Sequence, residues 1–449
     1  MNNKLDRDFG ILSLLKFTFP SILSLLFLSM YQMVDAVFIA NFISDNALAS
    51  VNIVYPVISV VIAITMMFSS GGSAVVAKNM GEGKKQIAKE NFTAIIIAVT
   101  VTSSVISLLV ILFMEPLLSF LGSTPLLHDD CYEYLVTLIP FMPLAALQMA
   151  LNAFFVTAGK PGISLVLTVI SGITNIVLDY VFIVILNMGM AGSAWGTVAG
   201  YIIAAVPGIL YCFFFRKGSL HFVKPKFRWR VIGFSCFNGS SEMISNLSIS
   251  VTTLLFNKIT LEFMGEAGVT AISVILYAQF LLTAMYMGFI SGTAPIFSFN
   301  LGKQNKQRLH DLFRHSLLTI IYLTVIIMIV SYAFATPIVS VYIKETSPAF
   351  PLAHHGFLLF SLSYLFAGFN IYASGLFTAL HNGKVSAIIS TMRTFVFLVI
   401  ALLALPRLLG TDGIWLAVPV AELMSCIVSM LYLFRYRKEY YFIKRSIMA

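Results

Sequence analysis

The sequence predicts an all-α polytopic membrane protein with twelve transmembrane helices arranged in two pseudo-symmetric six-helix lobes. Three observations predict this fold class: an apolar composition, twelve long apolar segments and an internal repeat. Of the 449 residues, 59% are hydrophobic and only 10% are charged, whereas soluble domains carry about 25% charged residues. Because a chain this apolar cannot cover a water-facing surface, we exclude soluble enzymes and nucleic-acid-binding proteins.

Hydropathy divides the chain into twelve segments, each long enough for the roughly 20 apolar residues that a spanning helix requires. The segments are uniformly apolar rather than alternating, which favours helices over barrel strands. The first segment is too long to be the apolar core of a signal peptide, so we expect it to be the first spanning helix. The twelve segments are residues 11–43, 50–77, 91–115, 132–158, 162–186, 192–215, 231–261, 268–300, 315–342, 353–380, 384–408 and 412–436.

The basic residues indicate the orientation of the chain in the membrane. Twenty-four of the 28 Lys and Arg residues lie in the N-terminal segment, in every second loop and in the C-terminal tail, among them Lys217, Lys444 and Arg445. Cytoplasmic loops carry the excess of Lys and Arg. We therefore expect a multi-pass protein of the cell membrane with both termini in the cytoplasm.

An internal repeat divides the chain into halves. The longest polar stretch, residues 216–230, is a predicted cytoplasmic linker between an N-lobe (residues 1–215) and a C-lobe (residues 231–449). Positions that match between the two halves are separated by six predicted helices, so the halves should share one topology. We expect a cleft for alternating access between the two lobes. A single constant offset, without gaps, pairs identical residues in Ser70-Gly71 and Ser291-Gly292, Asn79 and Asn300, Thr157-Ala158 and Thr378-Ala379, and Gly162 and Gly383.

Several kinds of site are not indicated by the sequence. The four cysteines have no CxxC spacing, which argues against a disulfide framework or a zinc site. The histidines form no HExxH set, and no Walker motif indicates an ATP-driven pump. We therefore expect no resident cofactor.

Four acidic residues fall well inside predicted helices: Asp35, Asp179, Glu242 and Glu422. A charged residue at the bilayer centre costs about 2.5–3.5 kcal/mol, so such residues are candidates for function. Glu242 follows the start of its predicted helix closely, where the helix dipole alone could stabilise a carboxylate. For Glu422 we expect a structural ion pair with Arg393.

Asn175 and Asp179 are four residues apart and share a helix face. Carboxylate and amide oxygens suit a hard cation such as Na⁺, and a buried carboxylate suits a proton. Asn175 could equally serve only to hydrogen-bond Asp179. On the helix of Asp35, Pro20 removes a backbone donor and is a candidate hinge.

Adaptable Met side chains suit promiscuous binding. Met33 and Met287 are therefore candidate cavity residues, although core or lipid-facing packing would explain a single Met as well.

Together these features resemble the multidrug and toxic compound extrusion (MATE) family, and most of all its bacterial MepA-like branch. The resemblance covers the whole chain. It rests on the runs Gln32-Met33-Val34-Asp35, Gly71-Gly72 to Asn79-Met80-Gly81-Glu82-Gly83, residues 295–302, and Asn175 to Asp179-Tyr180.

The resemblance implies export of lipophilic organic cations in exchange for H⁺ or Na⁺, and no enzymatic activity. It implies a coupling-ion site at Asp35, Asn175, Asp179 and Thr197, with a hinge at Pro20. Residues 352–380 contain no Asp or Glu, so the second acid of the family's C-lobe site is missing. The candidate cavity and substrate residues are Gln32, Met33, Tyr134, Asn152, Glu242 and Met287.

The expected partners are small lipophilic cations and the lipid bilayer, with no nucleic acid, and we expect a monomer. One alternative is a flippase for lipid-linked precursors, although acidic cavity residues do not favour a polyanionic lipid. A second alternative is a membrane-embedded transferase, which would need a His/Asp/Arg cluster that the sequence does not indicate.

Overall fold

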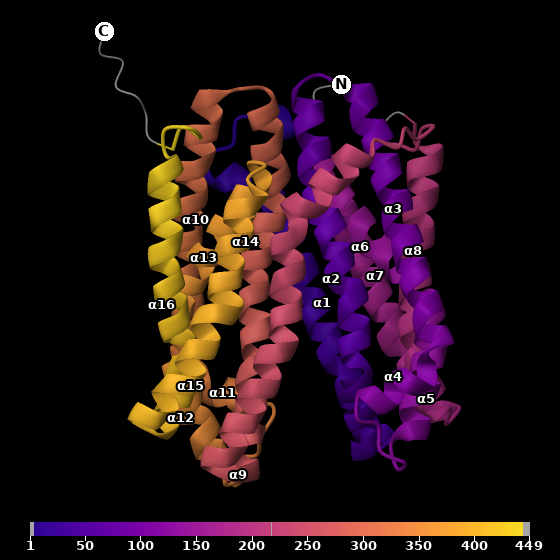
Figure 1. Cartoon of the computed structure of the whole chain (residues 1–449), viewed down its shortest axis with the longest axis vertical. Coiled ribbons are helices and arrows are strands. Elements are labelled where there is room, and N and C mark those ends of the chain that lie inside the picture. Colours follow the sequence, from indigo (N-terminus) through magenta and orange to yellow (C-terminus); the bar gives the residue numbers. More distant parts are fainter. Residues whose placement is uncertain (1–3, 217, 443–449) are drawn as a thin grey trace. The chain divides into compact units, whose positions relative to one another are not determined.

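A computed structural model describes residues 4–216 and 218–442 of the chain (Figure 1). All regular elements in this part of the chain are helical. Of the basic residues counted above, Lys217, Lys444 and Arg445 lie outside the described residues. The helices form two compact units, which we call unit 1 and unit 2.

Unit 1 comprises Leu23–Gly239 together with the described residues before Asp6. The part of α1 (Ile11–Phe42) after Ile22 belongs to it. Its further elements are α2 (Asp45–Gly81), α3 (Lys85–Leu112), α4 (Met114–Phe120), α5 (His128–Leu138), the 3₁₀-helix η2 (Ile139–Phe141), α6 (Met142–Thr157), α7 (Pro161–Asp179), the π-helix η3 (Tyr180–Ile185) and α8 (Gly189–Phe214).

Unit 2 comprises Asp6–Ile22 and the described residues from Ser240 onward. Both α1 and the long α9 (Trp229–Gly302) therefore contribute to both units, while the predicted lobe boundaries at residues 215 and 231 stay a prediction. The further elements of unit 2 are α10 (Lys306–Ala333), α11 (Ala335–Ser340), α12 (Ala349–Ser361), α13 (Tyr364–Ala379), α14 (Gly383–Thr391), the π-helix η4 (Met392–Val396), α15 (Phe397–Leu409) and α16 (Thr411–Tyr436).

The described helices account for twelve membrane spans. Ten of them are long and apolar enough to cross a bilayer. One of these, α9, has 74 residues and consists of two spans joined at Gly265, whose φ of 64° and ψ of −159° are not helical. The bent pair of α12 and α13 provides one more span. The predicted twelve-helix fold class is therefore confirmed.

Two of the spans predicted as continuous helices are broken. Residues 132–158 form α5 and α6 with η2 between them, because Pro140 and Pro143 lack the N–H groups that a continuous helix needs. Residues 353–380 form α12 and α13, which are bent by 52° relative to each other. The two breaks lie at equivalent positions of the repeat, although the second contains no proline.

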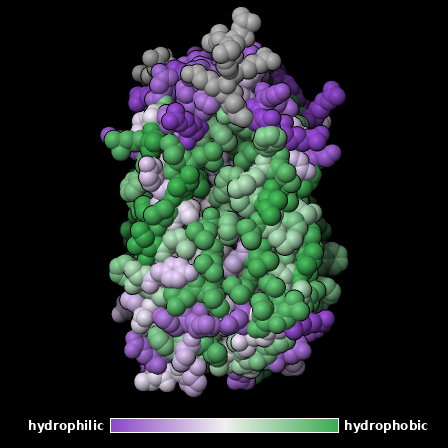
Figure 2. Space-filling view, turned by 90° about the vertical axis from the view of Figure 1, so that its left-hand side faces the viewer, coloured by the Kyte–Doolittle hydropathy of each residue, from purple (hydrophilic) through white to green (hydrophobic). Residues whose placement is uncertain are grey.

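The long helices expose large apolar side chains. Figure 2 shows a broad apolar band between polar ends on the surface of unit 2. Such a surface suits the hydrocarbon core of a bilayer, where helices satisfy their own backbone hydrogen bonds. Exposed apolar residues of unit 2 include Ile321, Val325 and Ile329 of α10 and Ile427, Leu431 and Phe434 of α16.

The predicted linker is packed against unit 1. The Phe222 ring stacks on that of Phe92 with 5.3 Å between centroids. Glu90, buried near the start of α3, forms ion pairs with Lys226 at 3.1 Å and Arg228 at 2.8 Å. The linker therefore forms part of one end of unit 1.

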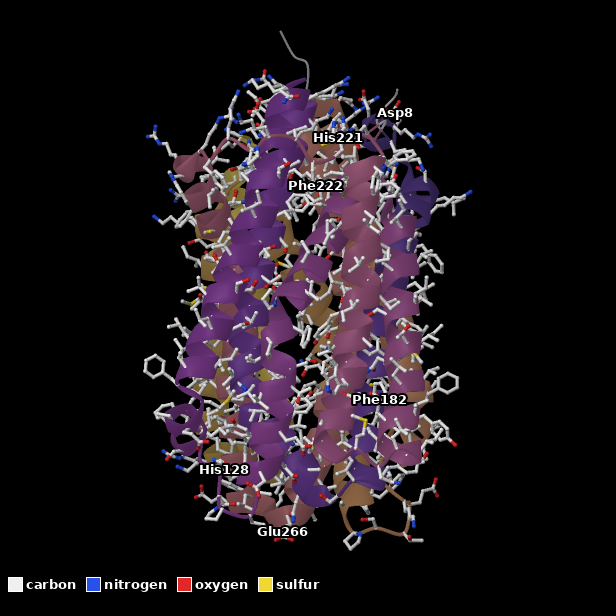
Figure 3. All side chains as sticks on the ribbon, turned by 90° about the vertical axis from the view of Figure 1, so that its right-hand side faces the viewer. Asp8, His128, Phe182, His221, Phe222 and Glu266 are labelled. Atoms are coloured by element: carbon white, nitrogen blue, oxygen red, sulfur yellow. The ribbon has the colours of Figure 1, made fainter. Side chains whose placement is uncertain are left out.

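Figure 3 identifies the two ends of unit 1. His221 and Phe222 lie at one end, and His128 and Phe182 lie toward the other. This placement agrees with loops that alternate between the two sides of the membrane.

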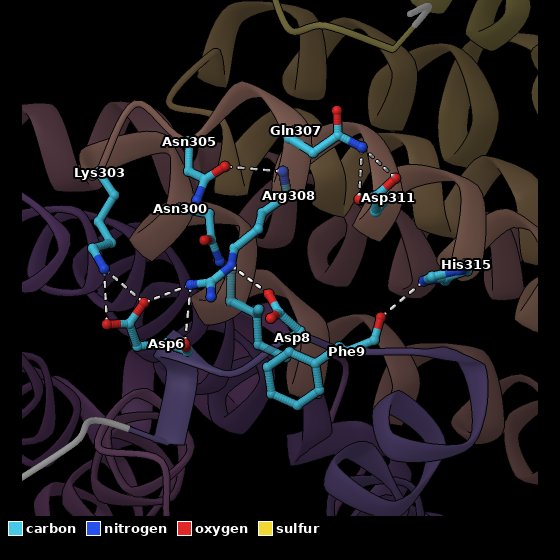
Figure 4. Close-up of polar contacts among 11 residues, drawn as sticks. Asp6, Asp8, Phe9, Asn300, Lys303, Asn305, Gln307, Arg308, Asp311 and His315 are labelled. Carbon is cyan, nitrogen blue, oxygen red and sulfur yellow. Dashed lines mark hydrogen bonds and ion pairs between the residues drawn. The ribbon is translucent and has the colours of Figure 1, made fainter.

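The N-terminal segment is bound to unit 2 (Figure 4). Asp6 forms ion pairs with Lys303 at 2.7 Å and Arg308 at 2.6 Å, and Asp8 pairs with the Nε atom of Arg308 at 2.6 Å. Burial raises the pKa of Asp6, but the hydrogen-bonded cations Lys303 and Arg308 outweigh this effect, and the net pKa lies below its ordinary value of 3.8. Asp6 and Asp8 therefore fasten the segment before α1 to the residues around the start of α10.

The segment directly after α16 docks on unit 2 as the linker docks on unit 1. The Phe442 ring stacks on that of Phe313 with 4.2 Å between centroids. Phe313 is the repeat counterpart of Phe92, and Phe442 directly precedes the position equivalent to Phe222. The repeat therefore extends to the segment that follows the last helix of each half.

Candidate functional site

A pair of carboxyl groups lies inside unit 1, one from α1 and one from α7. Asp35 is partly buried, and its Oδ1 atom accepts a hydrogen bond from the Ser193 hydroxyl of α8 at 3.3 Å. Asp179 is fully buried, and its neighbours are the Asp35 carboxyl group and the Asn175 side chain. Two neighbouring carboxylates cannot both stay charged without a compensating cation or a shared proton.

Asp179 has no conventional hydrogen-bond donor. Among the described residues, no N–H or O–H group donates to either of its carboxylate oxygens in normal geometry. Leaving a buried acceptor without a partner costs about 1–3 kcal/mol, and more for a charged group. The position is therefore suited to a proton or to a cation that these oxygens bind.

Three amide side chains of α6 and α7 also keep a buried oxygen without a donor among the described residues. Each of them turns its amide nitrogen to a hydroxyl oxygen 3.4 Å away, which leaves the amide oxygen free to accept. An amide oxygen of this kind is a suitable ligand for a hard cation. The donor–acceptor pairs are Asn175 and Thr197, Asn152 and Thr168, and Gln148 and Ser171, and the free atoms are Asn175 Oδ1, Asn152 Oδ1 and Gln148 Oε1.

Three tyrosines stand within electrostatic reach of Asp35: Tyr31, Tyr134 and Tyr201. Tyr134 was among the predicted cavity residues, whereas Tyr201 was not. Tyr201 follows Thr197 by four residues on α8, so the i, i+4 spacing that selected Asn175 and Asp179 could also have found it.

Glycines on α8 permit the close approach of α7 that the site requires. A Cβ atom added at Gly196 would collide with Oδ1 of Asp179. A Cβ atom added at Gly200 would lie 3.1 Å from the carbonyl and the hydroxyl oxygens of Ser171. Small residues at helix contacts in membranes allow this kind of packing.

The helical hydrogen bonding changes directly after Asp179. The π-helix η3 (Tyr180–Ile185) begins at the next residue, and α7 ends at Asp179. Single π-turns are rare and often occur at functional sites. The sequence contained no pattern from which this change could be predicted.

The remaining predicted residues are distributed over both units. Gln32 is exposed and Met33 is partly buried, on the same part of α1 as Asp35. Glu242 and Met287 are partly buried in unit 2, whereas the carboxyl pair belongs to unit 1. Pro20 lies in the part of α1 that belongs to unit 2.

Unit 2 contains the ion pair predicted for Glu422. The Nε atom of Arg393 lies 2.8 Å from Glu422 Oε1, and the two side chains are 11% and 6% exposed. This prediction is confirmed.

A family model described as MatE matches residues 20–181 and again residues 243–403. The Multidrug export protein MepA of Staphylococcus saprophyticus is 21% identical over 435 residues, which cover 94% of this chain and 93% of the relative. A protein of Shewanella oneidensis named FAD transporter is 23% identical over 425 residues, which cover 92% and 91%.

The fold is similar to that of a solved structure described as MATE in the straight conformation. The TM-score is 0.92 at 17% identity, and the alignment covers 98% of each chain. Because the family model matches well over half of the sequence, in two copies, this chain belongs to the MatE family, whose members are membrane transporters and not enzymes.

Proposed function

We propose that the protein exports lipophilic organic cations in exchange for H⁺ or Na⁺ by alternating access. The observation that carries this proposal is the neighbouring carboxyl groups of Asp35 and Asp179, whose surroundings supply acceptor oxygens but few donors. A site of this kind needs positive charge, which a proton, a sodium ion or an organic cation can bring.

The residues of the site have different roles in this proposal. Asp35 and Asp179 hold the coupling ion, with Asn175 Oδ1 and the Thr197 hydroxyl as neutral ligands if the ion is Na⁺. If the ion is H⁺, the two carboxyl groups share it. The proposed substrate contacts in unit 1 are Gln32, Met33, Tyr134 and Asn152, and those in unit 2 are Glu242 and Met287.

Export requires that the two ligands favour different arrangements of the protein. A ligand shifts a conformational equilibrium only through its different affinities for the two states. Pro20 lies two residues before α1 passes from unit 2 to unit 1, which supports its proposed role as a hinge. We also propose that both termini are cytoplasmic and that the protein acts as a monomer.

The names of the relatives support transport but differ in the solute. One relative is named for multidrug export and another for FAD, which carries phosphate groups. The charge of the solute is therefore the point that an experiment must establish.

The test is uptake of a permanently charged fluorescent cation into inside-out membrane vesicles that contain the protein. The vesicle interior is made acidic in one arm and loaded with Na⁺ in the other, and vesicles without the protein are the control. We expect uptake with one of the two gradients, which identifies the coupling ion. No uptake with either gradient, from vesicles that hold folded protein, would contradict the proposal.

A further inference from the structure

The contact between α6 and α7 of unit 1 holds amide groups outside the carboxyl pair. Gln148 of α6 is 6% exposed, and its Nε2 atom donates to the Ser171 hydroxyl of α7 at 3.4 Å. One turn later on α6, Asn152 Nδ2 donates to the Thr168 hydroxyl of α7, also at 3.4 Å. The two pairs follow each other along both helices, and we call them the amide ladder.

The hydroxyl groups of the amide ladder fix the orientation of its amides. A hydroxyl group has one hydrogen to donate. The Ser171 hydroxyl donates to the Gly200 carbonyl oxygen at 2.9 Å, and the Thr168 hydroxyl donates to a carbonyl oxygen of its own helix at 3.0 Å. Each hydroxyl therefore accepts from the amide nitrogen, and the amide oxygen is left over. Gln148 Oε1 and Asn152 Oδ1 accordingly have no donor among the described residues.

The helical scaffold does not require these amides. In the second half of the repeat, the positions of Gln148 and Asn152 hold Phe369 and Ala373, and those of their hydroxyl partners hold Ile389 and Met392. An acceptor that is buried without a partner reduces stability. The amide ladder is therefore better explained by a ligand than by packing.

A buried amide of unit 2 shows the fully partnered alternative. Asn370 Nδ2 donates to Glu422 Oε2 at 2.7 Å, and Asn370 Oδ1 accepts from the Ser429 hydroxyl at 3.0 Å. Together with Arg393, which pairs with the other oxygen of Glu422, these residues form the polar cluster of unit 2. No amide oxygen is left over there.

The amide ladder lies between the carboxyl pair and the linker end of unit 1. Asp179 precedes Phe182, which lies toward the opposite end (Figure 3), whereas the Ser219 hydroxyl of the linker donates to the Ala158 carbonyl oxygen just before α7, at 3.1 Å. Buried polar residues follow one face of α7 over fifteen residues, or about 22 Å. They are Ser164, Thr168, Ser171, Asn175 and Asp179.

The chemistry of the free oxygens selects the ion. Amide oxygens are hard ligands that suit Na⁺, but an amide is not an ionisable side chain that takes up a proton near neutral pH. Without a carboxylate the amide ladder binds a cation weakly, as conduction through several sites requires. Asn175, whose Oδ1 atom is also free, lies one turn from Ser171 and connects the amide ladder to Asp179.

We propose that the amide ladder is a second, weaker position for the coupling ion, in which Gln148 Oε1 and Asn152 Oδ1 bind Na⁺ between the carboxyl pair and the linker end of unit 1. The inference rests on the proposed function and deepens it, because it makes Na⁺ the coupling ion and gives it a path inside unit 1. Gln148 is the residue that tests it, since Asn152 is also a proposed substrate contact.

The first measurement is Na⁺ binding to the purified full-length protein, followed by the line width of the sodium NMR resonance. The background protein carries Asp35→Asn and Asp179→Asn, which remove the carboxyl pair. The test variant adds Gln148→Met, which keeps the length of the side chain and removes the amide oxygen. The matched control adds Asn370→Met, which removes a buried amide whose oxygen is already partnered.

We expect the background protein to keep weak Na⁺ binding with an affinity that does not depend on pH, because amides do not titrate. Adding Gln148→Met should lower this affinity about tenfold, as for the loss of one contact to a charged group. Adding Asn370→Met should leave it unchanged. An affinity that is insensitive to Gln148→Met, or a background protein without Na⁺ binding, would overturn the inference.

A second measurement keeps the carboxyl pair intact and does not depend on the folding of the background protein. Exchange of radioactive sodium is followed across proteoliposomes that hold the wild type, Gln148→Met or Asn370→Met at equal Na⁺ concentrations. We expect exchange about tenfold slower in Gln148→Met than in the other two proteins. Equal exchange rates in folded Gln148→Met and wild-type protein would overturn the inference.

This inference and the proposed export function fail in different ways. If an acidic vesicle interior drives uptake of the organic cation while the wild type neither binds nor exchanges Na⁺, export stands and the inference fails. If Gln148→Met weakens Na⁺ binding but no gradient drives uptake, the export function fails and the second ion position stands.

Discussion

Unit 1 and unit 2 carry different chemistry at equivalent positions of one repeat. The acidic and polar residues of the candidate ion site in unit 1 all have apolar counterparts at the equivalent positions of the second half. Asp35, Asn175, Asp179 and Thr197 correspond to Phe256, Val396, Ile400 and Val418. These four residues of the candidate ion site are therefore not repeated in the second half.

The polar cluster of unit 2 is likewise not repeated in unit 1. Arg393, Glu422 and Asn370 of unit 2 correspond to Gly172, Tyr201 and Met149 of unit 1. Yet both units keep the broken fourth span and the stacked Phe pair at their ends. The repeat preserves the helical scaffold and not the charges, so function has to be assigned to each unit separately.

The largest effect should follow from removing a carboxylate of unit 1. We expect Asp179→Asn to reduce gradient-driven uptake in proteoliposomes to background, because the pair can no longer exchange a coupling ion. The matched control is Glu266→Gln, which neutralises an exposed acid of unit 2 and should transport normally. Uptake at the wild-type level by a folded Asp179→Asn protein would contradict the proposal that ion coupling depends on the carboxyl pair of unit 1.

In unit 2, the largest expected effect comes from disrupting the ion pair of Arg393 and Glu422. Arg393→Gln alone should destabilise the protein by about 3–5 kcal/mol, because it leaves the buried Glu422 carboxylate unpaired. Adding Glu422→Gln should restore most of this loss. Unfolding free energies in mixed detergent micelles measure both, and a stable single variant would show that the pair is not structurally coupled.

A smaller effect is expected at the contact of α7 and α8. Gly196→Ala places a Cβ atom against Asp179 and should cost about 1–3 kcal/mol. The equivalent residue of unit 2 is Ala417, where no carboxylate occupies the space. Gly162→Ala is the control, since no heavy atom lies within 4 Å of its added Cβ atom. Equal thermal stability of both variants would mean that the close contact is relaxed in solution.

The smallest effect concerns the N-terminal segment of unit 2. Because the folded pKa of Asp6 lies below 3.8, its ion pairs stabilise the protein fully above that pH and are lost as the pH falls through the folded pKa. Asp6→Asn should therefore lower the unfolding temperature slightly at pH 6, and this difference should vanish in strong acid. Glu262→Gln, at an exposed acid, should show no such pH-dependent difference.

The spans could be predicted from sequence because few backbone structures are stable in the hydrocarbon core of a bilayer. Every N–H and C=O group in hydrocarbon needs an internal partner, so long apolar runs become helices. The break after Ser361 could not be predicted, since no proline or glycine marks it. The docking of the linker was also missed, because stacking of Phe222 on Phe92 is a long-range contact without a local pattern.

The candidate ion site was partly predictable from the spacing of its residues. Asn175 and Asp179 lie on one helix face, which spacing reveals, whereas the Ser193 hydroxyl reaches Asp35 from another helix. The clearance at Gly196 likewise depends on how α7 and α8 pack. The charged residues could therefore be predicted from the sequence, whereas the neighbours that position them could not.

The central claim is that Asp35 and Asp179 hold the ion that the organic cation displaces. The direct measurement is ion release when a permanently charged cation binds to the purified protein, followed with a pH indicator in weak buffer and with radioactive sodium. We predict release of H⁺ or Na⁺ from the wild type and none from Asp179→Asn. Undiminished release from an Asp179→Asn protein that still binds the cation would contradict the claim.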